Sequence, residues 1–147
     1  MVALWMIGYE DAPDRSAEIC ICEIFGRNVA AGSVGVGMGL HPFGDPRIRE
    51  QFSVETLSID PREFHIYAAE WTPEYVAFFV DHRLVKTVEQ SPAYPMQVML
   101  GIYEFPDEAE STQSVHPYPK QFIVDYFRGY RPIEPAPSAT PTAKHSP

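Results

Sequence analysis

Two glutamates, Glu18 and Glu23, are the residues of this 147-residue chain whose type and spacing best fit catalysis. Cleavage of a glycosidic bond with retention of configuration needs two carboxyl groups about 5 to 5.5 Å apart, one as nucleophile and one as acid/base. Glutamates on one face of one strand can reach this separation, because their side chains are long and flexible. Two exposed surface glutamates explain the spacing equally well.

The stretch that carries both glutamates predicts a strand with one irregularity. Glu18, Cys20 and Cys22 alternate with two isoleucines, so they share one face while the isoleucines share the opposite, buried face. Strict alternation would bury Glu23 and expose Ile24. One extra residue between the second isoleucine and Glu23, a β-bulge, returns Glu23 to the face of Glu18 and Ile24 to the core.

Apolar runs in the rest of the chain are short, rich in Val, Ile, Phe and Tyr, and separated by Gly, Pro and Asp. This pattern predicts an all-β protein. Residues 75–80 and 84–88 are expected to form a hairpin, although the absence of Gly and Pro from 74–91 also allows a helix. In the hairpin, Asp81 and His82 are expected to form a two-residue turn, since both residue types tolerate positive φ better than most.

Two later segments are also expected to be strands. Residues 96–104 alternate between an apolar face, expected against the core, and a mixed face, expected toward a groove. Residues 121–130 read as a late strand that closes the domain. The apolar face of 96–104 consists of Met96, Val98, Leu100 and Ile102; the mixed face consists of Gln97, Met99, Gly101 and Tyr103.

Composition excludes several classes of partner. The formal net charge of -9 disfavours nucleic acid and anionic membrane surfaces, and no apolar run of about 18 residues is present to span a membrane. A disulfide between Cys20 and Cys22 is not expected, because residues two apart on a strand lie near the limit of disulfide geometry. No metal or cofactor is predicted, because no metal-binding spacing occurs among His41, His65, His82, His116 and His145.

The chain divides into one folded domain, residues 1–131, and a proline-rich tail, residues 132–147, which is expected to be disordered. Residues 1–9 contain no basic region before their apolar stretch, so no secretory signal is expected in them. The cellular location is left open, because an upstream segment would change this expectation.

The segment from Glu18 to Glu23 resembles the Glu-x-Asp-x-x-Glu signature of glycoside hydrolase family 16, in its laminarinase-like branch. The resemblance continues along residues 3–131 in the family's order. It implies an antiparallel β-sandwich of the jelly-roll, concanavalin A-like kind. The flanking segments that resemble the family are Ala3 to Met6, Phe64 to Pro73, Tyr94 to Leu100 and Val124 to Arg128.

The resemblance implies a role for each residue of the motif. Glu18 matches the nucleophile and Glu23 matches the general acid/base. Cys20 stands where the family has an aspartate that tunes the nucleophile, and a thiol is a weaker hydrogen-bond donor that is mostly neutral at pH 7. Activity with this cysteine is expected to be reduced, shifted in pH optimum or absent.

The resemblance also suggests substrate-binding residues. His41 matches a cleft histidine on the following strand, while Trp5 and Tyr103 match aromatic positions near the cleft. A purely structural role is an equal alternative for each of the three. His65 and Trp71 are assigned to structural support.

The expected function is hydrolysis of a β-linked polysaccharide, with endo-acting cleavage of β-1,3-glucan as the first choice. A lectin-like sandwich that binds glycan without cutting it is the alternative from another class, and a purely structural domain is the third. The family's strands before the tryptophan segment have no counterpart in residues 1–147, so an incomplete N-terminal side is expected. Oligomeric state is left open.

Overall fold

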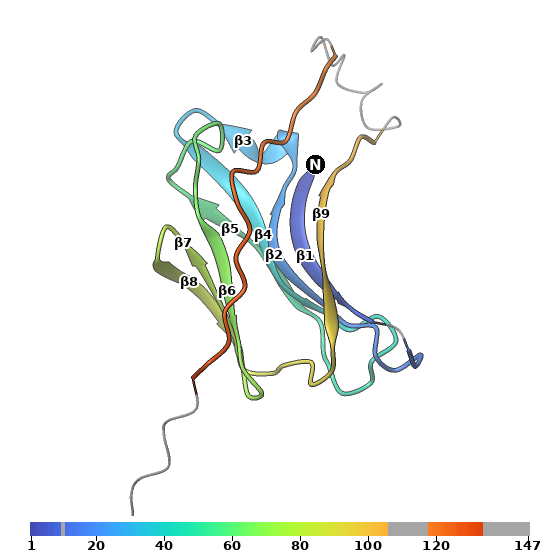
Figure 1. The fold of residues 1–147 in the computed structure, drawn as a ribbon. Helices are drawn as coiled ribbons and strands as arrows, with labels where there is room; N and C mark the ends of the chain where they lie inside the picture. Colours follow the sequence, from blue (N-terminus) through green and yellow to red (C-terminus); the bar gives the residue numbers. More distant parts are fainter. Residues whose placement is uncertain (10, 106–117, 134–147) are drawn as a thin grey trace, which may run out of the picture.

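The computed structural model describes residues 1–9, 11–105 and 118–133. Within them the chain forms two antiparallel β-sheets packed face to face, with one short 3-10 helix (Figure 1). The all-β antiparallel sandwich expected from the sequence is confirmed. None of the helical structure described is long and apolar enough to cross a membrane.

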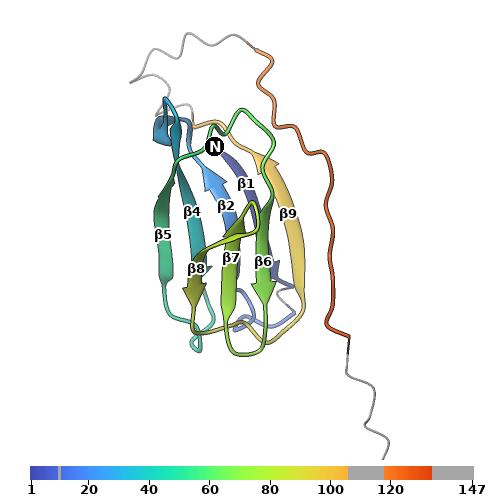
Figure 2. The same cartoon turned by 90° about the vertical axis from the view of Figure 1, so that its left-hand side faces the viewer.

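The larger sheet has six strands and the smaller sheet has three. Seen face-on, the large sheet runs β5, β4, β2, β1, β9, and the small sheet lies in front of it (Figure 2). The two-residue β3 pairs with the start of β4. The large sheet contains β1 (Val2–Gly8), β2 (Glu18–Ile24), β3 (Val29–Ala30), β4 (Ser33–His41), β5 (Gln51–Leu57) and β9 (Met96–Ile102); the small sheet contains β6 (Tyr67–Trp71), β7 (Val76–Val80) and β8 (Arg83–Val88).

The core lies between the sheets and is built from the alternate residues of β2, β4 and β7. Phe78 on β7 is fully buried, as are Ile19 on β2 and three residues of β4, namely Val36, Met38 and Leu40. Removing one such side chain from water contributes about 1.5–3 kcal/mol. These side chains turn one face of β2 and β4 toward the small sheet. The opposite face of the large sheet, hereafter the outer face, is left for the remaining residues of these strands.

The hairpin between β7 and β8 forms as predicted. Asp81 and His82 occupy its turn with φ of 48° and 64°, the positive values that a tight two-residue hairpin requires. The Asp81 carboxylate also accepts hydrogen bonds from Ile66 N–H at 2.9 Å and from His65 Nδ1 at 2.7 Å. His65 Nε2 contacts the Asp60 carbonyl oxygen at 3.0 Å, so both ring nitrogens of His65 serve the fold.

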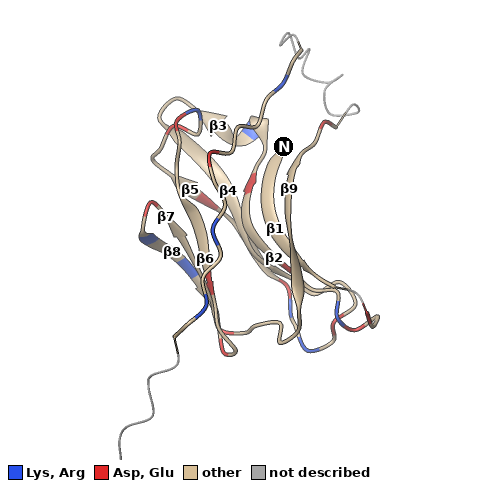
Figure 3. Cartoon of the chain, in the orientation of Figure 1, with Lys and Arg blue, Asp and Glu red and all other residues tan. Residues whose placement is uncertain are grey.

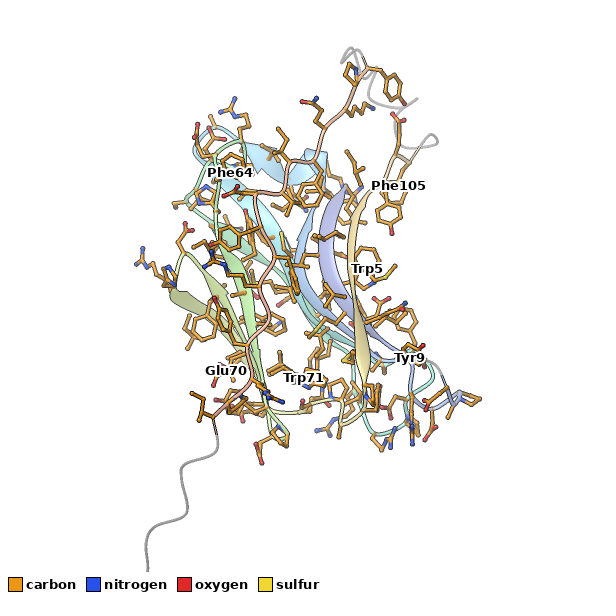
Figure 4. All side chains as sticks on the ribbon, in the orientation of Figure 1. Trp5, Tyr9, Phe64, Glu70, Trp71 and Phe105 are labelled. Atoms are coloured by element: carbon orange, nitrogen blue, oxygen red, sulfur yellow. The ribbon has the colours of Figure 1, made fainter. Side chains whose placement is uncertain are left out.

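Trp71 is likewise held by a structural contact. Its indole Nε1–H donates to the Pro92 carbonyl oxygen at 3.0 Å, which ties the end of β6 to the segment that leads into β9. Figure 4 places Trp71 at this end of the small sheet, far from Trp5 on the large sheet.

β9 alternates as predicted, but its inner face is only partly covered. Met96 packs against the core, whereas Val98, Leu100 and Ile102 are 40%, 45% and 48% exposed. Figure 2 shows the reason, since β9 extends beyond β6, the last strand of the small sheet on that side. Figure 3 shows no charged residue on β1 or β9, so this margin of the sandwich is uncharged.

The prediction of a strand at residues 121–130 is wrong. The segment is extended but pairs with no described strand, and its apolar side chains are exposed, with Ile123 at 65% and Phe127 at 54%. In Figure 2 it runs beside the sandwich without joining either sheet. A strand-like sequence becomes a strand only when a neighbour accepts and donates its backbone hydrogen bonds.

Two further expectations concern the ends of the chain. Residues 134–147 of the expected proline-rich tail lie outside the described residues. The expected incompleteness of the sandwich on its N-terminal side stays a prediction.

The exposed inner face of β9 predicts self-association of residues 1–147. An apolar strip at a sheet edge promotes association of chains, so sedimentation velocity at rising protein concentration is expected to show oligomers. The double variant Val98→Thr/Leu100→Thr makes the exposed strip less apolar, and threonine at both positions is β-branched and therefore suits a strand. This variant is expected to shift the protein toward monomer. Val54→Thr, at a 50% exposed position on β5, is the matched control. A wild-type protein that stays monomeric throughout contradicts this prediction.

Candidate active site

A β-bulge in β2 sets the directions of its side chains. In the ladder between β1 and β2, Leu4 lies opposite Cys22, and the next residue of β1, Trp5, lies opposite Cys20. Ile21 is left without a partner. The predicted bulge is therefore present, but the extra residue is Ile21 itself and not, as predicted, the residue between Ile21 and Glu23.

The bulge separates the residues of β2 onto two faces. Glu18, Cys20 and Glu23 lie on the outer face, where the Cys20 sulfur contacts both glutamates. Cys22 was expected on this face, and that expectation is wrong, because the extra residue turns Cys22 inward. The residues of β2 in the core are Ile19, Ile21, Cys22 and Ile24.

Cys20 joins the two glutamates at the centre of the site. Its sulfur lies 3.8 Å from Glu18 Oε2, to which it donates a weak hydrogen bond, and 4.0 Å from Glu23 Oε1. Both carboxyl groups therefore lie next to one shared neighbour. Burial, reinforced by the negative charges of Glu23 and Glu18, raises the pKa of the Cys20 thiol far above its ordinary value. Cys20 is therefore a neutral group.

Glu23 is the carboxyl group whose pKa the site raises. Burial disfavours its charged form and raises the pKa, while the nearby His41 opposes the shift to a smaller extent. Glu23 therefore holds its proton to higher pH than an exposed glutamate. This is the property that a general acid near neutral pH requires.

Two glycines of β4 leave room for these side chains. Gly37 lies opposite Glu23, and a Cβ atom at Gly37 would come within 2.4 Å of the Phe52 ring and 3.2 Å of the Glu23 Cβ. Gly39 lies opposite Cys20 with φ of +141°, where a Cβ would meet the Gln51 carbonyl oxygen at 2.1 Å. Larger residues at either position would displace the neighbours of the carboxylates.

Trp5 and Tyr103 lie together near the carboxylates. Trp5 is directly opposite Cys20 in the ladder, so its side chain shares the outer face, and Figure 4 shows it on the side of the large sheet turned from the small sheet. The Tyr103 ring lies 6.0 Å from the Trp5 ring at an interplanar angle of 49°. Tyr103 is 44% exposed. The pair presents aromatic surface beside the carboxylates.

His41 also reaches the site, with two partners that sequence reasoning missed. It lies directly opposite Glu18 in the ladder between β2 and β4. Its Nδ1 contacts Glu50 Oε1 at 2.8 Å, and its ring stacks on Phe52 at 4.6 Å between centroids. The available signal was the hairpin register, because Leu40 pairs with Gln51 and continuing this register by one residue brings Glu50 opposite His41.

The structure therefore brings all six predicted site residues, Glu18, Cys20, Glu23, Trp5, His41 and Tyr103, to one face of the large sheet. Among the described residues, no group of three or more His, Cys, Asp or Glu side chains is placed to hold a metal ion. The two carboxyl groups of this arrangement can perform acid/base and nucleophilic chemistry.

Comparison with known proteins identifies similar chains. The family model described as glycosyl hydrolases family 16 matches residues 1–125. A beta-glucanase from Rhodothermus marinus is 30% identical over an alignment 158 positions long, which covers 90% of this chain and 52% of that protein. The chain thus spans about half the length of this curated relative.

One solved structure shares both fold and sequence similarity with this chain. It is a GlcNAcα1-4Gal-releasing endo-β-galactosidase from Clostridium perfringens, 28% identical, with a TM-score of 0.55. The match covers 67% of this chain and 26% of that one.

The neutral state of Cys20 predicts how the site responds to an added charge. In Cys20→Asp, a carboxylate beside Glu23 would disfavour the charged form of Glu23, so the highest carboxyl pKa of the coupled group is expected to rise. Titration of side-chain carboxyl groups by 13C NMR measures this change. Cys20→Ser, which keeps a neutral hydrogen-bond donor, is the matched control and is expected to leave that titration near its wild-type position. A highest pKa that is unchanged or lowered in Cys20→Asp contradicts the arrangement.

Proposed function

The chain belongs to glycosyl hydrolase family 16, and from this premise we propose that it hydrolyses O-glycosidic bonds of a β-linked polysaccharide by a retaining, two-glutamate mechanism. The observation that carries the proposal is the contact of one sulfur, that of Cys20, with both Glu18 and Glu23 on the outer face. The chain spans about half the length of its curated relative, so we propose both its hydrolytic activity and its substrate.

In the first step, the Glu18 carboxylate attacks the anomeric carbon while Glu23 gives its proton to the departing glycosidic oxygen. The carbon–oxygen bond of the linkage breaks as the bond to Glu18 forms, which leaves a covalent glycosyl-enzyme. The raised pKa of Glu23 supports its assignment as the acid, because this carboxyl group stays protonated to higher pH than usual.

In the second step, Glu23 acts as the base. Now ionised, it takes a proton from a water molecule, the water oxygen attacks the anomeric carbon, and Glu18 leaves as a carboxylate. Two displacements on one carbon restore the original β configuration. One pair of glutamates therefore suffices for both steps.

Cys20 assists as a neutral hydrogen-bond donor. Its S–H contact with Glu18 orients the nucleophile, and the high pKa of the thiol means that it adds no negative charge beside the acid/base. A thiol donates more weakly than a protonated carboxyl group. Burial of Glu23 is thus the main influence that raises the pKa of the acid in this site.

The proposed substrate is a β-1,3-linked glucan, cleaved within the chain. The name of the Rhodothermus marinus relative, a beta-glucanase, supports glucan. The Trp5 and Tyr103 rings offer the flat apolar surface on which a pyranose ring can stack. The solved relative acts as an endo-β-galactosidase, which makes β-galactan the second substrate to test.

A glycan-binding protein without hydrolytic activity is the second candidate function. The observation that favours it is Cys20, a buried neutral thiol at the position where the resembling motif has an aspartate. A chain that binds laminarin in affinity electrophoresis but releases no reducing ends would support this candidate.

Replacing either glutamate tests the proposed mechanism. Glu23→Gln is expected to lower the release of reducing ends from laminarin by about 100-fold or more, because the proton donor is lost. Glu18→Gln is expected to abolish turnover, because an amide cannot replace the carboxylate nucleophile. Both variants should still bind laminarin, since the lost interactions act in the transition state.

Glu74→Gln, at an exposed loop position before β7, is the matched control and should keep wild-type turnover. Near-normal turnover in Glu18→Gln would refute the assignment of the nucleophile.

A further inference from the structure

We propose that Glu50 is a positioning residue for the reaction: it accepts the Nδ1–H of His41 and thereby presents the second ring nitrogen, Nε2, to a hydroxyl group of the bound glycan. The consequence for turnover rests on the proposed function. The contact between Glu50 and His41 can be tested whether or not the chain hydrolyses glycans.

The carboxylate of Glu50 is placed to select one form of the His41 ring. Both of its oxygens lie near Nδ1, Oε1 at 2.8 Å and Oε2 at 3.0 Å. A carboxylate only accepts hydrogen bonds, so Nδ1 must carry a proton in this contact. In the neutral ring Nε2 is then the unprotonated nitrogen and can accept a hydrogen bond from a hydroxyl group.

Two aromatic side chains restrict rotation of the same ring. Phe52 stacks on His41 at 4.6 Å between centroids and an interplanar angle of 27°, and Phe43 lies 5.9 Å away at 57°. Phe52 is the aromatic ring nearest to a Cβ built at Gly37, the glycine opposite Glu23. The stack and the carboxylate together fix both the plane of the imidazole and its rotation.

The fixed ring faces the carboxyl pair. His41 lies directly opposite Glu18, so the two side chains leave the sheet on the same face as neighbours. The same ring lowers the pKa of Glu23 and so opposes part of the effect of burial on that carboxyl group. The titratable and charged groups around the ring are Glu18, Glu23 and Cys20 on β2 and Glu50 beside β5.

A second histidine–carboxylate pair shows what a structural arrangement looks like in this chain. His65 contacts Asp81 through Nδ1 and the Asp60 carbonyl oxygen through Nε2, so the protein uses both nitrogens. That pair lies in the loop and turn beside the small sheet. It provides a matched control for loss of a carboxylate next to histidine.

The experiment combines imidazole 15N NMR with kinetics on laminarin. In the wild-type protein above the titration range of the ring, His41 is expected as the Nδ1–H tautomer. Glu50→Ala is expected to move it toward the Nε2–H tautomer that free imidazole side chains favour, and to lower kcat by about tenfold. Glu50→Gln keeps an acceptor oxygen and is expected to retain the tautomer and most of kcat. Asp81→Asn should change neither the His41 tautomer nor kcat.

The outcomes separate the two proposals. An unchanged His41 tautomer in Glu50→Ala, or a changed tautomer with wild-type kcat, overturns the positioning role. If the wild-type protein releases no reducing ends, the proposed function fails, and the tautomer of His41 in Glu50→Ala still decides whether Glu50 positions this ring.

Discussion

The unpaired residue Ile21 determines which way each later side chain of β2 points. If Ile21 were paired in regular alternation, the two-residue repeat of a strand would send Glu23 into the core and Ile24 outward. With the bulge, Ile21 and Cys22 both face the core, and Glu23 joins Glu18 on the outer face. The bulge interrupts the ladder locally and leaves one residue unpaired. Burial of four β2 side chains in the core stabilises it, so the fold itself holds the two carboxyl groups together.

Charge within the site follows from that geometry. Two carboxyl groups already share the sulfur of Cys20, and a third carboxylate about 4 Å from each would add repulsion on the order of 4 kcal/mol per pair at an effective dielectric constant near 20. The thiol avoids this cost because burial and its acidic neighbours keep it protonated. Glu23 then owes its raised pKa mainly to burial. Protonation of the acid thus depends on how well neighbouring side chains exclude water.

Local patterns in the sequence were sufficient for much of the fold. The break in alternation between Glu18 and Ile24 predicted the bulge, and Asp81 with His82 predicted the hairpin turn, since each signal arises within a few residues. The orientation of Cys22 was wrong because alternation does not tell which residue of a bulge is the extra one. Residues 121–130 have a strand-like pattern, but pairing depends on a neighbouring edge that no local pattern reveals.

The site was predicted less completely than the fold, for the same reason. Glu18 and Glu23 stand close in sequence, so one strand was enough to bring them together. Glu50 and Phe52 reach His41 across the turn between β4 and β5, and their contact depends on the hairpin register. That register becomes visible only when both strands are aligned residue by residue. Partners supplied by a neighbouring strand are therefore the part of such a site that sequence reasoning misses most easily.

Covalent labelling tests the central claim most directly, because it reports which atom of the site attacks the sugar. A 2-deoxy-2-fluoro β-laminaribioside with a good leaving group traps the glycosyl-enzyme, and peptide mapping by mass spectrometry locates the added sugar. The account predicts one label per chain, on Glu18. A label on Glu23, or no label in a protein that releases reducing ends from laminarin, would contradict it.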